Sequence, residues 1–253
     1  MPHEGAGNKM SHGFDPSAQP AELETQNRFG RVSGAMIEKN ELRLVELVAA
    51  RISHDLVGPV GATVNGIELL SDGEAADPEV VRLIGQSARQ ASRRLQVFRA
   101  IYGTAGALPA GAPFAAASGL LAAMLEGEKV ASAAWSGDPA LEASAGRAGA
   151  RVTLLAAFLL VEALPRGGEI NVAAKQVDGT ARIEVSGLGT GARFFEEVQS
   201  ALAGKVPVDE LTAKSAPAEI LRRLAAGIGG QLGVASERDK LMISIVFPAL
   251  GED

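Results

Sequence analysis

Apolar and small residues recur over residues 40–70 with the spacing of an amphipathic helix. In heptad order the stripe contains Leu42, Val45, Ala49, Ile52, Leu56, Pro59, Thr63, Gly66 and Leu70. Asn40 is of the type that caps a helix N-terminus, and Ser71-Asp72-Gly73 ends the pattern. We therefore expect one long helix with a kink at Pro59, because a proline inside a helix removes a backbone hydrogen bond.

A second amphipathic helix is predicted to begin at Asp77-Pro78, a pair suited to the N-cap and the first helical position. Its stripe contains Ile84, Ala88, Ala91, Leu95, Phe98 and Tyr102. Two helices alone cannot bury both stripes. Residues 40–103 are therefore expected to form a helical hairpin that pairs with a second copy, giving a homodimer built on a four-helix bundle.

The pattern changes after a linker rich in glycine and proline, and residues 114–250 alternate between helical and strand-like segments. We expect helices over 114–126, 151–164, 194–204 and 217–228, and strands over 130–135, 169–175, 181–186, 231–236 and 241–247. Asp178-Gly179 predicts a tight turn between two of the strands. The expected fold class is α+β: an N-terminal hairpin followed by an α/β sandwich.

The segments outside these two domains carry little apolar pattern. Residues 1–36 mix Gly, Pro, Asn, His and charged residues without an apolar signal-peptide core, so we expect a disordered tail. Residues 100–125 are uncharged, but they contain repeated Gly and Pro. We read them as a helix end, a linker and the next helix start, and we expect a cytoplasmic protein without a membrane partner.

Charge and cysteine content narrow the function classes. The net charge is −6, whereas a general nucleic-acid binder usually has a basic excess, so no nucleic-acid partner is expected. The chain has no cysteine, which excludes disulfides and thiolate metal sites.

His54 is the histidine that draws attention, since the other two, His3 and His12, fall in the predicted tail. It lies on the side of the first helix farthest from the apolar stripe, where the following residues are small. A lone histidine on a helix is usually an ordinary surface residue, so its neighbours have to decide its role.

Those neighbours resemble a known motif. The segment Ser53-His54-Asp55-Leu56-Val57-Gly58-Pro59 resembles the phosphoacceptor motif of two-component sensor histidine kinases, which also sits on the first helix of a dimeric hairpin. Residues 114–248 resemble the ATP domain of these kinases. The shared features are an apolar helix that ends at Pro165-Arg166-Gly167-Gly168, the loop Gly187-Leu188-Gly189-Thr190-Gly191, and a last helix with Gly229-Gly230 at its end.

The second domain departs from active kinases where they bind ATP. The apolar helix lacks the asparagine that helps to hold magnesium, and its nearest equivalent is Glu162. Gly187 replaces the aspartate that recognises adenine, and Lys214-Ser215-Ala216-Pro217 stands in place of the second glycine-rich box. The loop at 187–191 is then more simply a glycine-rich turn than a nucleotide site. We expect no ATP binding and no cofactor or metal of its own.

A phosphoacceptor histidine without an ATP site resembles the ChpT-type histidine phosphotransferases of bacterial phosphorelays over nearly the whole chain after residue 40. The resemblance implies that His54 carries a phosphoryl group between response-regulator receiver domains, that Asp55 holds the ring proton, and that the receiver supplies Mg²⁺. The receiver is expected to dock over the residues that follow His54 on the exposed face: Val57, Gly58, Gly61, Val64 and Asn65.

Two other functions remain open on the sequence. The chain fits a sensor histidine kinase with a divergent ATP site. It also fits a non-enzymatic adaptor on the same fold, in which His54 would be dispensable.

Overall fold

The computed structural model of the chain describes residues 20–71, 77–103, 108–109, 111–137 and 139–249. The chain divides into two units, residues 1–42 and 43–253. In the first unit, residues 20–42 belong to helix α1 (Pro20–Ser71). The predicted helix start at Asn40 is therefore wrong, and residues 20–36 of the predicted tail are helical. Residues 1–19 lie outside the described residues.

The early start of α1 has a local cause. Pro20 occupies the first helical position, where its missing N–H costs nothing. The residues after it include Ala, Glu, Leu, Gln and Arg, which have high helix propensity, and no further proline occurs before Pro59. Gly30 and Gly34 lower the helix propensity of this segment, but no proline interrupts the helix there.

In the second unit, α1 continues to Ser71, its predicted end, and α2 spans Pro78–Tyr102. The Asp77 side chain caps α2 by accepting a hydrogen bond from the Glu79 backbone N–H at 2.9 Å. Gly66 permits close approach of the two helices, because a Cβ at this position would collide with Ile84 of α2. Both predicted helices are thus present, and their pairing with a second copy stays a prediction.

The remaining chain forms one five-stranded mixed sheet with helices. The elements are α3 (Pro113–Leu125), β1 (Val130–Gly137), α4 (Pro139–Glu162), β2 (Gly168–Val177), β3 (Thr180–Leu188), α5 (Glu196–Leu202), the 3₁₀ turn η1 (Val208–Glu210), α6 (Ala216–Gly227), β4 (Gln231–Glu237) and β5 (Lys240–Pro248). The strand order is β1-β2-β3-β5-β4. Among the described strands, β1 and β2 alone pair in parallel, because the intervening helix α4 returns the chain to the same end of the sheet.

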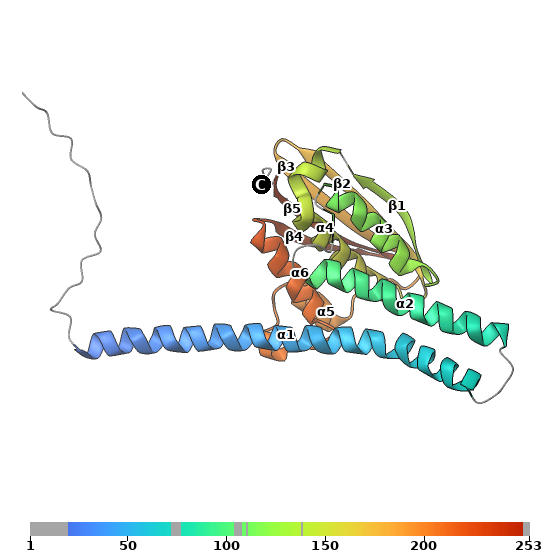
Figure 1. Cartoon of the computed structure of the whole chain (residues 1–253). Helices are drawn as coiled ribbons and strands as arrows, with labels where there is room; N and C mark the ends of the chain where they lie inside the picture. The colour runs from blue at the N-terminus through green and yellow to red at the C-terminus, as the bar shows by residue number, and fades with distance from the viewer. Residues whose placement is uncertain (1–19, 72–76, 104–107, 110, 138, 250–253) are drawn as a thin grey trace, which may run out of the picture. The chain divides into compact units, whose positions relative to one another are not determined.

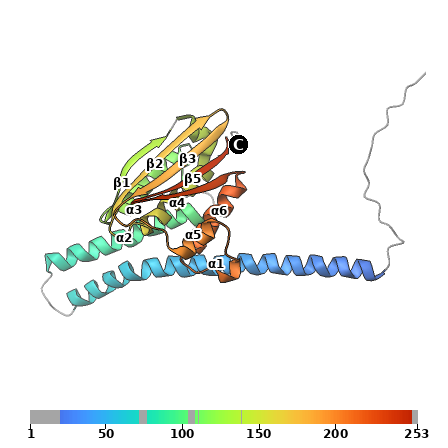
Figure 2. The same ribbon diagram turned by 180° about the vertical axis from the view of Figure 1, so that it is seen from behind.

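Helices α3, α4 and α6 lie against one face of this sheet (Figures 1 and 2). The strands show the corresponding alternation, with Ile170, Val172 and Ala174 of β2 buried between more exposed neighbours. Helix α4 lies at the centre of the core, and its residues 152–160 are buried throughout. The predicted fold class, an α+β chain with N-terminal helices and a C-terminal α/β layer structure, is confirmed.

The connection between β2 and β3 is a tight turn whose residues suit its backbone conformation. Asp178 and Gly179 join β2 to β3 with positive φ angles of 49° and 72°, the conformation expected of a two-residue hairpin turn. Helix α4 begins at Pro139 rather than near Arg151, and Gly146, with φ 49° and ψ −146°, interrupts its helical conformation. Among the described residues, no helix is long and apolar enough to cross a membrane.

Candidate functional site

His54 lies on α1 with its side chain 84% exposed, as predicted from the heptad register. Its Nδ1 atom is 3.1 Å from Oδ1 of Asp55, the other residue that we predicted to take part in catalysis. Asp55 is only 11% exposed. The ring is therefore open to solvent, and one of its nitrogens faces a nearly buried carboxylate.

Arg51 fixes the Asp55 carboxylate from the preceding turn of α1. Its Nε donates to Oδ2 of Asp55 at 2.8 Å, and its Nη2 donates to Oε1 of Glu162 at the end of α4. The Arg51 guanidinium also lies 5.0 Å from the centroid of the Phe158 ring. A buried charge needs such partners, and here two carboxylates and an aromatic ring supply them.

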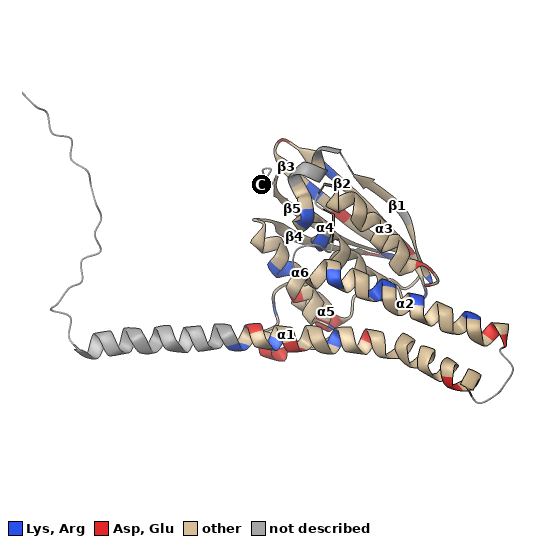
Figure 3. Cartoon of the chain, in the orientation of Figure 1, with Lys and Arg blue, Asp and Glu red and all other residues tan. Residues whose placement is uncertain are grey.

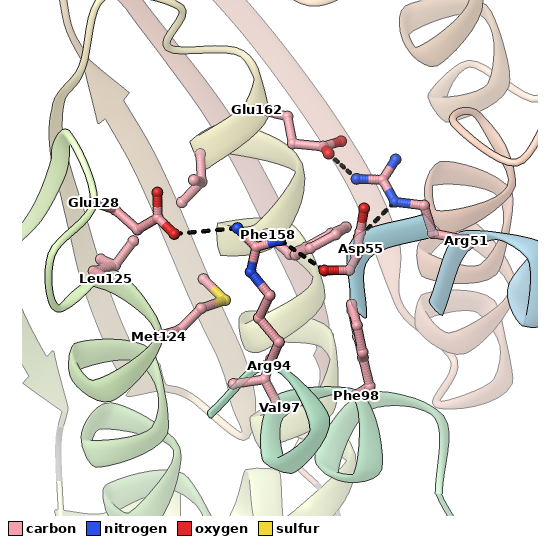
Figure 4. A pocket seen from close by; sticks show the side chains of 11 residues that line it. Arg51, Asp55, Arg94, Val97, Phe98, Met124, Leu125, Glu128, Phe158 and Glu162 are labelled. Atoms are coloured by element: carbon pink, nitrogen blue, oxygen red, sulfur yellow. Dashed lines mark hydrogen bonds and ion pairs between the residues drawn. The ribbon is translucent and has the colours of Figure 1, made fainter. Parts of the chain in front are cut away.

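Arg94 of α2 reaches the same turn from another side. Its Nη1 donates to the backbone carbonyl of Asp55 at 2.9 Å, and its Nη2 is 3.2 Å from Oε1 of Glu128, which lies between α3 and β1. Figure 4 shows the two arginines on either side of Asp55, each also facing an acid from the C-terminal layer structure. These side chains line a cavity of about 180 Å³.

Tyr102, at the end of α2, stands close to this group of charges. Its hydroxyl is buried and has no hydrogen-bond partner within the part of the chain that the structure describes. Burial raises the pKa of the Tyr102 hydroxyl above its ordinary value; the nearby Arg51 opposes this shift and Asp55 adds to it. The phenol therefore stays protonated and adds no charge beside Asp55.

The face of α1 that follows His54 is open and uncharged. Val57 is 70% exposed and Val64 is 48% exposed. A Cβ added at Gly58 or Gly61 would meet no atom within 4 Å. Asn65 is also exposed, and no charged residue occurs between Asp55 and Glu68 (Figure 3). All five residues predicted to contact a receiver therefore lie on one surface with His54. Four of them are exposed, and Gly61 is half-buried.

The loop that resembles a nucleotide loop is occupied by the protein's own contacts. Gly187 is buried, and a Cβ added there would lie 3.5 Å from the side chains of Ile170, Leu160 and Leu164. The backbone N–H of Gly191 donates to Oδ1 of Asp239 at 2.7 Å, and that of Gly189 to the Asp239 carbonyl at 3.0 Å. The loop thus closes onto the turn between β4 and β5.

The segment in place of the second glycine-rich box starts helix α6. Ser215, Ala216 and Pro217 are buried, and the hydroxyl of Ser215 accepts a hydrogen bond from the Thr212 N–H at 3.0 Å. Lys214 lies over the ring of Phe195, 2.9 Å from its centroid. No group of three or more His, Cys, Asp or Glu side chains suited to a metal ion occurs among the described residues.

Known proteins resemble this chain in sequence and in fold. Residues 114–240 match the family described as histidine phosphotransferase C-terminal domain. The protein phosphotransferase ChpT of Brucella abortus (strain 2308) is 35% identical over 173 residues, covering 66% of this chain and 79% of the relative. The chain belongs to the histidine phosphotransferase family.

One solved structure also agrees with this family membership. A bacterial phosphotransferase superposes with a TM-score of 0.68 and 27% identity, covering 81% of this chain and 96% of the other. A histidine kinase domain from Erythrobacter litoralis, with a TM-score of 0.43 and 15% identity, covers 84% of this chain and 93% of that one. The family match, the Brucella relative and the bacterial phosphotransferase structure confirm the predicted resemblance to ChpT-type histidine phosphotransferases.

The site around His54 also contains residues that the sequence did not predict. Arg51 and Glu128 were not singled out, and Glu162 was noted only where kinases have an asparagine. The spacing of Arg51 and Asp55, four residues apart on one helix, is a signal for the first ion pair. Nothing local indicates the pairing of Arg51 with Glu162, because these residues are 111 positions apart.

Proposed function

We propose that this histidine phosphotransferase acts in the cytoplasm and relays a phosphoryl group between the receiver domains of two response regulators, with His54 as the phosphorylated residue. The observation that carries the proposal is the exposed His54 ring with Nδ1 facing a nearly buried Asp55 carboxylate. Arg51 holds that carboxylate in place. A surface histidine without a function would not need this support.

The proposed chemistry uses the two ring nitrogens differently. Nδ1 keeps a proton that Asp55 accepts as a hydrogen bond, so the lone pair is on Nε2. Nε2 attacks the phosphorus of a receiver aspartyl phosphate, an N–P bond forms, and the P–O bond to the aspartate breaks. The receiver regains its carboxylate. The ring gains positive charge, which the Asp55 carboxylate offsets. The reverse step passes the phosphoryl group to the second receiver.

Charge on the moving phosphoryl group has to be neutralised by a partner. Phosphoryl transfer depends mainly on in-line positioning and on stabilisation of the phosphoryl oxygens. We propose that the receiver supplies the Mg²⁺ for this purpose and that the present chain binds no metal or cofactor. The receiver docks over Val57, Gly58, Gly61, Val64 and Asn65, where small side chains allow close approach to His54.

We further propose that the protein does not phosphorylate itself from ATP. The apolar surroundings of Gly187 support this, because a carboxylate that recognised adenine from that position would lie among leucine and isoleucine side chains. The ion pair between Glu162 and Arg51 supports it too, since this carboxylate already has a partner. A divergent kinase is therefore the less favoured function.

A homodimer through the hairpin forms part of the proposal. Exposed apolar side chains lie along both helices, including Val45, Val60 and Ile67 of α1 and Val81 and Leu95 of α2. Exposed apolar side chains in this number on two neighbouring helices are consistent with a protein interface. The second copy would cover it and complete a four-helix bundle.

The test uses the full chain, a receiver labelled on its aspartate, and the variant His54→Gln. We expect label to move to the wild-type protein and not to His54→Gln, with unchanged helix content by circular dichroism because the side chain is exposed. Incubation with labelled ATP should label neither protein. Transfer to His54→Gln would refute His54 as the acceptor, and labelling of the wild type by ATP alone would restore the kinase alternative.

A further inference from the structure

Pro59 leaves one backbone acceptor free in the turn of α1 that carries His54. A proline has no N–H, so the carbonyl four residues earlier loses its helical hydrogen bond. That carbonyl belongs to Asp55, the residue next to His54, and Pro59 lies inside the helix. A buried carbonyl without a partner costs free energy, and the turn around it loses a restraint.

Arg94 supplies the missing donor. Its Nη1 donates to the Asp55 carbonyl at 2.9 Å from the neighbouring helix α2. The side chain of Arg94 is 32% exposed, and its Nη2 is tied to Glu128 at 3.2 Å. Gln90, one turn earlier on α2, donates to the same Glu128 oxygen at 2.9 Å. The guanidinium of Arg94 is thus held by Glu128, and Gln90 in turn holds Glu128.

Asp55 is consequently held at two points by two arginines. Arg51 binds its side chain and Arg94 binds its backbone carbonyl. Each arginine also pairs with an acid from outside the hairpin, Glu162 for Arg51 and Glu128 for Arg94. Figure 4 shows this arrangement around Asp55. The C-terminal layer structure thereby fixes the residue that orients the His54 ring.

We propose that Arg94 is a positioning residue for phosphotransfer: it replaces the helical hydrogen bond that Pro59 removes and so fixes the turn that presents His54. The inference rests on the proposed role of His54. A pair between exposed charges would contribute little, so the bond to the freed carbonyl is the part that matters. Displacement of a reacting group by about 1 Å can cost on the order of a hundredfold in rate, so a small loss of restraint is measurable.

Arg93 offers a matched control on the same helix. It donates to the carbonyls of Ala123 and Glu126 and pairs with the Glu126 carboxylate at 2.7 Å. It therefore ties α2 to the same region as Arg94, and these hydrogen bonds end on α3 and its C-terminal cap rather than on α1. Arg93→Met removes an arginine and a contact of similar kind, and it leaves the Asp55 carbonyl bonded.

The experiment measures transfer from a phosphorylated receiver over a range of receiver concentrations. We expect Arg94→Met to lower the maximal rate about tenfold or more with an unchanged KM, because positioning of His54 is impaired and the docking face is intact. Arg93→Met should behave like the wild type. A raised KM with an unchanged maximal rate in Arg94→Met would overturn the inference, since Arg94 would then act in receiver binding.

Pro59→Ala distinguishes the proposed role of Arg94 from a merely structural one. If Arg94 were only structural, its loss would have the same effect with or without Pro59. Alanine restores the N–H, so the Asp55 carbonyl regains a helical partner. In this background Arg94→Met should lower the maximal rate by less than about threefold, since the two changes are coupled. An undiminished effect of Arg94→Met would refute the role assigned to the freed carbonyl. Should Arg94→Met fail to fold, the same comparison applies to Arg94→Lys, which retains a single donor group and should show a smaller fall that Pro59→Ala again suppresses.

His54→Gln, measured in parallel, separates this inference from the proposed function. An inactive His54→Gln together with a fully active Arg94→Met would refute the inference alone. Transfer that persists in His54→Gln would refute the proposed acceptor, and the positioning role would fall with it.

Discussion

Oδ1 of Asp55 lies 3.1 Å from Nδ1 of His54, and the opposite nitrogen of the ring, Nε2, is on the side away from this carboxylate. The pair is sequential, yet the two side chains differ sharply in exposure, 84% for His54 and 11% for Asp55. The exposed ring can meet a large partner, whereas the nearly buried carboxylate is constrained by Arg51. One turn of α1 therefore leaves the His54 ring accessible to a partner and also holds the carboxylate that orients this ring.

Asp55→Asn should slow phosphorylation of His54. The amide has no charge to offset the developing positive ring, and it binds Arg51 less strongly. We expect a fall on the order of tenfold to a hundredfold in the rate with the small donor phosphoramidate. Glu68→Gln, which removes an exposed acid from the same helix, serves as control and should retain the wild-type rate. A wild-type rate for Asp55→Asn would show that the carboxylate does not act on the ring.

Gly61→Arg should block the receiver and leave His54 chemically intact. A side chain at Gly61 has open space around it, so the arginine would project from the surface that follows His54. Transfer from a receiver is expected to drop sharply, whereas phosphorylation by phosphoramidate should survive. Gly61→Ala adds only a methyl group and should transfer normally. Unchanged receiver transfer in Gly61→Arg would mean that the receiver approaches from another side.

Leu95→Asp should convert the predicted dimer to a monomer. Leu95 is 53% exposed on α2 and belongs to the apolar stripe that is expected to face the second copy. A charge in an apolar interface has to be desolvated without a partner, which is costly. Val177→Asp is a suitable control, because Val177 is 54% exposed at the end of β2, outside the hairpin. Sedimentation velocity at micromolar concentration should show a dimer for the wild type and Val177→Asp only.

Glu219→Gln should destabilise the protein more than Glu79→Gln, although both acids pair with an arginine three residues later. Glu219 is 3% exposed and accepts hydrogen bonds from Arg222 and Arg223, each at 2.7 Å. Loss of such charge-assisted bonds costs about 1.5–3 kcal/mol in the free energy of unfolding. Glu79 is exposed and paired at the surface, so its substitution should change stability little.

The effect of Glu219 should also depend on pH. Burial raises the pKa of its carboxyl, but the hydrogen bonds from Arg222 and Arg223 outweigh burial and hold the pKa below the ordinary value. A lowered folded-state pKa gives stability that is complete above the ordinary carboxyl range and is lost as the pH falls. The gap in the free energy of unfolding between wild type and Glu219→Gln, measured with denaturant, should therefore become smaller as the pH is lowered. A gap that widened on acidification would contradict this assignment.

Short-range sequence signals predicted most elements correctly. The Asp77-Pro78 pair sets the start of α2, and Asp178-Gly179 sets the β2–β3 turn, because capping and turn geometry depend on residues next to each other. The start of α1 was mispredicted because residues 20–36 lack the apolar stripe on which the prediction depended, although no proline interrupts the helix between Pro20 and Pro59. The interruption of α4 at Gly146 was not predicted, because the sequence does not reveal the φ angle of a single glycine.

The sequence alone determined the helix that carries His54, the exposed orientation of that side chain, and the resemblance to phosphotransferases, because these depend on helical periodicity and on contiguous motifs. Only the tertiary structure decided how Asp55 is held. Arg94 meets the Asp55 carbonyl across 39 positions, and Arg51 meets Glu162 across 111. Such pairs depend on how α1 and α2 meet α4 and the loop between α3 and β1, and no local pattern encodes which arginine reaches which acid.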